Sequence, residues 1–144
     1  GRFIDSLHGF LQEEKGQNLL AAYWRSVQIL ESEEQRDRIK YHGEICCDGD
    51  GTSYEDTIVK RLNNIEQQYP KDKNWFDLLP MINDLADLRT PLDDFFDQVR
   101  INDPDPDIRR NRLELLALVR HHMHRILDFG ELIRAGFGKP ASAG

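Results

Sequence analysis

The residues best suited to contact a ligand are five arginines within residues 108–127. Arginine carries a planar fork of donors that matches phosphate oxygens and the edges of bases. The same stretch contains one acid, Glu114, so its formal charge is +4. This pattern fits contact with nucleic acid, although arginines on an amphipathic helix are often simply solvated. The five are Arg109, Arg110, Arg112, Arg120 and Arg125.

Three histidines in the same stretch offer a second kind of chemistry. Residues three apart share one face of a helix, so the rings of His121 and His124 could meet. Two imidazoles without a carboxylate in register are weak evidence for a metal site. We therefore interpret these histidines as solvated or facing RNA.

The segment 41–53 contains an Asp-Gly-Asp-Gly sequence and two adjacent cysteines, which suggest metal binding. A calcium loop needs glycine at position 6 and a bidentate glutamate at position 12, and neither register of this segment supplies both. A zinc site built on Cys46, Cys47 and His42 lacks a second Cys/His pair at a familiar separation. An irregular loop with a free cysteine pair and no metal is the prediction for this segment.

Catalytic patterns are missing from the sequence, because no nucleophile pairs with a base and no glycine-rich loop could hold a phosphate group. Asp93, Asp94 and Asp97 are better interpreted as acids near a helix start that face arginines of a neighbouring helix. We expect no catalytic residue, and no chemistry by this chain alone.

Composition bounds the class of protein. With 144 residues, 39% of them hydrophobic and 31% charged, the chain suits one soluble domain with a real core. No apolar run approaches the roughly 20 residues that span a bilayer, so no membrane is expected. Two adjacent cysteines cannot form a disulfide framework, which favours a reducing, cytoplasmic location. The net charge of -7 argues against indiscriminate binding of nucleic acid.

Hydrophobic spacing predicts an all-α helical bundle of about five to six helices, with no strands. We expect Gly16 to stop the first helix, Asn18 to cap the second, and Ser53 to form a capping box with Asp56. Pro80 is tolerable only in a first turn, which favours a start at Asp77 for the fourth helix. The expected helices cover roughly 2–14, 18–40, 53–70, 77–88, 91–99 and 107–128.

The domain is expected to cover residues 1–133, with a short closing turn near 129–133 and a flexible tail over 134–144. The first helix begins without a visible cap, so the chain is interpreted as a fragment of a larger subunit.

Three segments, taken in order, resemble one known family. Leu88–Val99 reads LRTPLDDFFDQV, Arg109–Leu116 reads RRNRLELL, and Asp128–Leu132 reads DFGEL. Together they resemble the C-terminal, DALR-type anticodon-binding domain of the beta subunit of bacterial glycyl-tRNA synthetase. Upstream, Asn18–Leu30 (NLLAAYWRSVQIL) is similar to a helix of the same family, so the resemblance spans about residues 2–133. Trp24, Gln28 and the two cysteines depart from the family's pattern.

The resemblance implies an α-helical domain that recognises the anticodon region of tRNA(Gly). Aminoacylation, with ATP and Mg, would be carried out by the full alpha/beta enzyme, a tetramer, and the domain itself would need no cofactor. Its partners would be tRNA(Gly), the alpha subunit and the rest of the beta subunit. The alternative is a non-catalytic helical module that mediates protein contacts in subunit assembly.

Anticodon loops are single-stranded, and they are read by stacking and by hydrogen bonds to base edges. The outward face of the last helix is therefore predicted to contact RNA, while Arg112 is predicted to brace the segment at Pro91 through Asp93 or Asp97. The predicted RNA contacts are Arg109, Arg110, Arg120, His121, His124 and Arg125. The predicted bracing residues are Asp93, Asp97, Asn111 and Arg112.

Overall fold

The computed structural model describes residues 2–45, 51–71 and 78–126, with the side chains from residue 7 onward. Within these residues it contains six α-helices and no strand, which confirms the predicted all-α bundle. The helices are α1 (Arg2–Gln12), α2 (Glu14–Asp37), α3 (Ser53–Gln68), α4 (Leu79–Ala86), α5 (Arg89–Gln98) and α6 (Pro106–His124).

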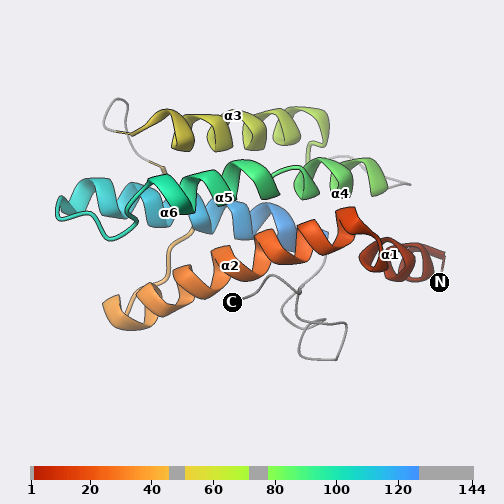
Figure 1. The fold of residues 1–144 in the computed structure, drawn as a ribbon, viewed down its shortest axis with the longest axis horizontal. Coiled ribbons are helices and arrows are strands. Elements are labelled where there is room, and N and C mark those ends of the chain that lie inside the picture. Colours follow the sequence, from red (N-terminus) through yellow and green to blue (C-terminus); the bar gives the residue numbers. More distant parts are fainter. Residues whose placement is uncertain (1, 46–50, 72–77, 127–144) are drawn as a thin grey trace.

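The long helix α2 runs across the molecule and forms one side of the bundle (Figure 1). It packs against α1, α4, α5 and α6, while α3 packs against α4, α5 and α6. Helices α4 and α5 follow one another almost end to end, between α2 and α3 in this view. Helix α6 therefore lies between α2 and α3, and both of these helices contact it.

The core is built on the periodic apolar residues of these helices. On α6, Leu113, Leu116, Val119 and Met123 are completely buried, as their spacing predicted. Burial extends around most of α6, because Leu115 and several charged residues of this helix are also buried. A helix buried on so many sides must pair its charges, since an isolated buried charge costs several kcal/mol.

The first turn between helices differs from the prediction. Gly16 does not stop a helix: α1 ends at Gln12, α2 begins at Glu14, and Gly16 lies buried in the first turns of α2. A Cβ at Gly16 would lie 2.1 Å from the carbonyl oxygen of Phe10 and 2.5 Å from Cα of Leu11. Gly16 is therefore a contact point between two helices. Asn18 is not a cap either, since it lies within α2 and accepts a hydrogen bond from Arg89.

Helix starts elsewhere follow the predicted chemistry with small shifts. The capping box of α3 is formed by Thr52 and Glu55, one residue before the predicted pair Ser53 and Asp56. Asp105 caps α6, and Pro106 occupies its first position. Pro80 lies in the first turn of α4, as predicted.

Some expected features fall outside the described residues. They are the closing turn at 129–133 and the tail at 134–144. Two helix bounds differ from the prediction: α4 begins at Leu79, with Leu78 as its N-cap, instead of starting at Asp77, and α6 ends at His124 instead of continuing to 128. Among the residues described, no helix is both long enough and apolar enough to cross a membrane.

Gly16 provides a test of this packing. We expect Gly16→Ala to destabilise the chain by about 2–3 kcal/mol, because the new methyl group would overlap backbone atoms that cannot move aside. The measurement is the free energy of unfolding from urea denaturation. Gly9→Ala is the matched control: Gly9 is exposed on α1 with nothing within 4 Å of an added Cβ. There alanine should stabilise the helix by about 0.5–1 kcal/mol. Equal effects at both sites would contradict the role assigned to Gly16.

Candidate nucleic-acid interface

All six predicted RNA contacts lie on α6 or directly after it, but they do not form one surface. Arg109 and Arg110 lie in the first turn, and the other four lie at or beyond Arg120. At 1.5 Å per residue, the two groups are about 15 Å apart along the helix axis. Each group must therefore be considered with its own neighbours.

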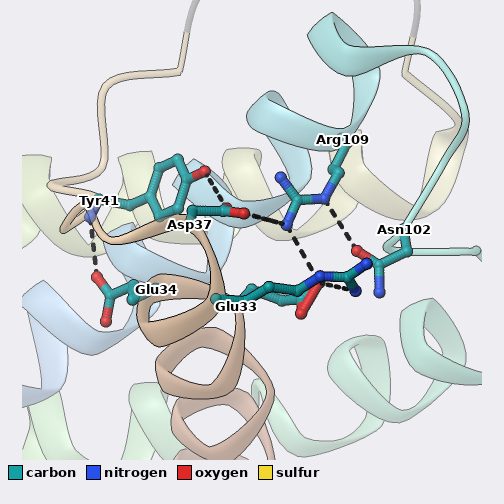
Figure 2. Close-up of polar contacts among 7 residues, drawn as sticks. Glu33, Glu34, Asp37, Tyr41, Asn102 and Arg109 are labelled. Carbon is teal, nitrogen blue, oxygen red and sulfur yellow. Dashed lines mark hydrogen bonds and ion pairs between the residues drawn. The ribbon is translucent and has the colours of Figure 1, made fainter.

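Arg109 is held in a network with the end of α2 (Figure 2). Its Nη2 donates to Glu33 at 3.1 Å and to Asp37 at 2.9 Å, and its Nε donates to Asn102 at 2.9 Å. The hydroxyl group of Tyr41 donates to the same Asp37 at 2.7 Å. The guanidinium group of Arg109 is thus used inside the protein, where it fastens the start of α6 to α2.

The network shifts the acidity of its members. The hydrogen bond from Tyr41 and those from Arg109 hold the pKa of Asp37 below its usual value, against the effect of burial. Burial raises the pKa of Tyr41, and the hydrogen bond to Asp37 adds to that rise. Asp37 is therefore a carboxylate and Tyr41 a neutral phenol at neutral pH. Both forms suit the hydrogen bonds observed.

Arg120 is buried, with 8% of its surface exposed, and makes a two-pronged ion pair with Glu34 at 2.8 and 2.9 Å. A third bond joins it to the carbonyl oxygen of Tyr41 at 3.0 Å. This corrects the prediction of an RNA-facing arginine, because its donors are committed to α2 and to the chain that follows it. Burial alone would raise the pKa of Glu34, but the hydrogen bonds from Arg120 and from the Tyr41 backbone outweigh it and lower that pKa.

Glu114 also holds the connection that follows α2, but as a hydrogen-bond acceptor. Its carboxylate accepts hydrogen bonds from the backbone N–H groups of His42 at 2.9 Å and Gly43 at 3.0 Å. Glu114 is 3% exposed. The one acid of the basic stretch is therefore structural.

Arg112 is buried and braces the structure, but through other partners than Asp93 or Asp97. It donates to the carbonyl oxygen of Arg100 at 2.6 Å and lies 3.4 Å from both Glu55 and Asp103. The sequence pattern suggested partners on α5, whereas Arg112 points toward the connection before α6 and the cap of α3. Its neighbour Asn111 is half-buried, and its bracing role stays a prediction.

Asp93 and Asp97 both contact Arg25 of α2, and Asp93 also contacts Arg89 of its own helix, α5. Asp93 lies 3.4 Å from Arg25 of α2 and 3.0 Å from Arg89 of α5. Asp97 lies 3.7 Å from Arg25, whose guanidinium group also stacks on Phe96 at 4.7 Å. These acids join α5 to α2, and they neutralise the arginines at this surface, which therefore does not form a basic face.

At the far end, Arg125 donates to the carbonyl oxygen of Tyr69, and its Nη1 lies 3.3 Å from Glu66 of α3. His121 is exposed and contacts Lys71, while Nε2 of His124 is 2.9 Å from the hydroxyl group of Tyr23. The two histidines thus have different partners. Within the described part of the chain, no cluster of three or more metal-ligating side chains occurs. Cys46 and Cys47 lie outside that part.

Arg110 is the one arginine of the predicted set that is exposed and not half-buried or buried. No ion pair of Arg110 occurs among the described residues.

A cleft of about 940 Å³ lies between α2 and the second half of α6. Its α2 wall carries Trp24 and Gln28, and its α6 wall carries His121 and His124. The connection after α2 closes one side. The lining residues are Tyr23, Trp24, Val27, Gln28, Glu31, Ser32, Gln35, Lys40, Tyr41, His42, Ala117, Arg120, His121 and His124.

The cleft combines an indole ring, imidazole rings, amides and a lysine, which are the groups that read unstacked bases. His121 and His124 were predicted from the sequence, whereas Trp24, Lys40 and His42 were not. The sequence did contain a signal for the α2 wall of the cleft. One face of α2 carries a residue of this wall every three to four positions: Trp24, Gln28, Glu31 and Gln35. Their role became visible only once α6 was placed against that face.

The pair Arg120–Glu34 gives a stability prediction. Arg120→Met should cost about 3 kcal/mol, because it leaves the carboxylate of Glu34 without its charge partner in a largely buried place. The double variant Arg120→Met/Glu34→Leu should recover much of that loss, since no unpaired charge remains. Arg110→Met, on an exposed position of the same helix, should change the free energy of unfolding by less than about 0.5 kcal/mol. Similar losses for Arg110 and Arg120 would refute the assignment.

The lowered pKa of Glu34 gives a pH prediction. A depressed carboxyl pKa contributes stability above its ordinary value of 4.5, and this contribution disappears as the pH falls through the folded-state pKa. The free energy of unfolding of the wild type should therefore fall more steeply below about pH 4.5 than that of Glu34→Gln. Denaturation curves measured from pH 6 to pH 3 test this, and parallel curves would contradict it.

Comparison with known proteins assigns the chain to a family. Residues 19–129 match the family described as DALR anticodon binding domain. This match spans both walls of the cleft and nearly all of the described core.

Individual relatives agree with the family match. A glycine–tRNA ligase beta subunit of Rhodospirillum centenum is 35% identical over 141 residues, which cover 90% of this chain and 18% of that protein. That of Phenylobacterium zucineum is 36% identical over 129 residues, with 90% and 19% covered. That of Rickettsia felis is 33% identical, with 90% and 18% covered. The chain thus spans less than a fifth of these relatives, and no solved structure matches it. On its sequence and its helical architecture, this chain belongs to the DALR anticodon binding domain family.

Proposed function

We propose that this chain is the anticodon-binding domain of a glycine–tRNA ligase beta subunit, and that it binds the anticodon arm of tRNA(Gly) in the α2–α6 cleft. The observation that carries the proposal is the coincidence of two facts. The family match covers residues 19–129, and the cleft formed within that range offers side chains suited to unstacked bases. The names of the relatives supply the identity of the RNA.

The charge distribution supports recognition by shape and stacking. Four of the five arginines of the basic stretch are used in internal contacts, so the face expected from the local charge of +4 is largely neutralised. With a net charge of -7, the chain would bind random RNA poorly. Affinity would come mainly from bases placed against Trp24 and the histidines, with a few phosphate contacts.

Within a whole enzyme, the domain would contribute tRNA binding, and chemistry would occur elsewhere. Aminoacylation with ATP and Mg would belong to the assembled alpha/beta tetramer in the cytoplasm, with the alpha subunit and the rest of the beta subunit as partners. RNA contacts by His121, His124 and the exposed Arg110 remain part of the proposal. Arg125 would act mainly by positioning the residues after α3.

Titration with a labelled anticodon stem-loop of tRNA(Gly) tests the proposal, with a scrambled loop as the comparison. We expect Trp24→Leu to weaken binding about tenfold, because leucine cannot stack on a base and one stacked base is worth about 1–3 kcal/mol. Trp24→Phe should retain most of the affinity, since phenylalanine keeps an aromatic plane. Tyr54→Leu is the matched control, because Tyr54 is an exposed aromatic residue at the start of α3, outside the cleft.

Two outcomes would contradict this function. If the wild type bound neither stem-loop at 50 mM salt and high micromolar RNA, the role as a protein-interaction module in subunit assembly would be favoured. If Trp24→Leu and Tyr54→Leu bound as the wild type does, RNA would contact another surface. Melting temperatures of all variants separate loss of binding from loss of folding.

A further inference from the structure

Nitrogen-bearing side chains meet at one corner of the molecule, where α6 ends near the segment that follows α3. The ammonium group of Lys71 contacts Nε2 of His121. The ring of His121 lies edge-on to that of His122, with centroids 5.6 Å apart. Arg125, one turn after His121, holds the carbonyl group of Tyr69 and so keeps the segment leading to Lys71 against α6. We call Lys71, His121 and Arg125 the basic corner.

The corner has more cationic groups than carboxylates. Glu66 of α3 lies 3.3 Å from Arg125 and 3.2 Å from Nε2 of His122. The second distance is short, but the two groups are not aligned for a hydrogen bond. No carboxylate within the described residues forms an ion pair with Lys71. Within the described part of the chain, Glu66 thus lies beside both Arg125 and His122, while the ammonium group of Lys71 contacts the ring of His121.

His121 is held in its neutral form. Because the ammonium group of Lys71 donates to Nε2, that nitrogen must act as an acceptor, which only the uncharged ring can do. Partial desolvation lowers the pKa of His121 although the residue remains exposed, and the electrostatic effects of Lys71, His122 and Arg125 lower it further, against the opposing effect of Glu66. An anion placed beside both groups would favour the protonated ring instead.

We propose that the basic corner binds a backbone phosphate of the RNA whose bases occupy the cleft, and that His121 takes up a proton when it does so. This inference rests on the proposed function. His121 lines the cleft and contacts Lys71, so bases and phosphate would be bound on either side of one residue. Phosphate oxygens would receive hydrogen bonds from Lys71 and from the protonated ring. Arg125 would hold the site in shape.

Other ionisable groups face the cleft and must be separated from His121 in any test. Glu31 and Tyr23 belong to α2, and Lys40 and His42 belong to the connection after it. His124 and Arg120 come from α6, and Arg120 is already paired with Glu34. Of the cleft histidines, His121 is the one whose ring nitrogen contacts the ammonium group of Lys71, so the linked proton is assigned to it.

The test measures the affinity of the 144-residue chain for the anticodon stem-loop at pH 5.5, 6.5 and 7.5, at constant ionic strength. Wild-type affinity should rise about five- to tenfold from pH 7.5 to pH 5.5, because binding takes up one proton. His121→Gln keeps an acceptor for Lys71 but cannot gain a charge, so its affinity should change less than twofold. His8→Gln, at an exposed histidine on α1, is the matched control and should retain the wild-type pH dependence.

Lys71→Met tests the phosphate contact. It should weaken binding at every pH, and it should reduce the slope of log affinity against log salt by about 0.7–0.9, as expected for one lost phosphate contact. Lys60→Met, at an exposed lysine on the surface of α3 outside the cleft, should leave the slope unchanged.

Inorganic phosphate separates this inference from the proposed function. Ring resonances of His121 should show its pKa rising by at least half a unit in 20 mM phosphate compared with chloride of equal ionic strength. An unchanged pKa in phosphate, together with RNA binding that is independent of pH or unaffected by His121→Gln, overturns the basic corner while the cleft proposal stands. Failure of the wild type to bind the stem-loop at any pH overturns the proposed function and the RNA phosphate site with it, even if free phosphate shifts His121.

Discussion

The burial of α6 between α2 and α3 is the constraint on which the rest of the structure depends. A central helix normally carries apolar residues all round, yet this one also buries Arg112, Glu114, Arg120 and His122. Each buried charge requires a partner in a fixed position, because leaving one alone costs several kcal/mol. The partners come from α2, from the ends of α3 and from the connections between helices. Packing of one helix thus determines where several distant segments must lie.

The ion pairs that α6 makes with α2 contribute more to the geometry of the cleft than to the free energy of unfolding. Buried ion pairs are often no better than apolar residues of the same size, but removing one partner is expensive, so a pair favours one arrangement over others. Arg109 contacts Glu33 and Asp37, and Arg120 contacts Glu34. Three acids within about one turn of α2 are therefore contacted by two arginines at separate positions along α6. Rotation of either helix would break both contacts, so the walls of the cleft keep their separation.

Local sequence patterns predicted the helices well, but they did not predict which charged side chains are buried and paired. The apolar stripe of α6 could be predicted from the spacing of its residues. Leu113 and Met123 lie on one apolar face of the helix, and such a face is buried whatever it packs against. The same spacing could not distinguish a solvated arginine from a buried paired one, and Arg120 turned out to be the latter. The partner Glu34 lies 86 positions away, beyond the reach of any helical period.

Glycine and capping signals were misjudged for similar reasons. Gly16 has the sequence signature of a stop, but its small size is needed for the backbone of α1 to approach α2, which no local rule contains. The segment Thr52–Asp56 offers two overlapping capping patterns, and the structure uses the earlier one. His121 and His124 were found because they share α6 with its apolar stripe. Trp24 was not, since its importance depends on which helix packs beside it.

The connection after α2 is fixed at two points. Gly43 has a φ of +95°, which side-chain-bearing residues rarely adopt, and its backbone passes so close to α6 that an added Cβ would lie 3.1 Å from Cα of Leu118. Its N–H group is held by Glu114. At the other end, Thr52 is locked into the capping box of α3. Because each anchor is held by its own contacts, we expect insertions or deletions between Gly43 and Thr52 to be tolerated, at an entropic cost that grows only slowly with length.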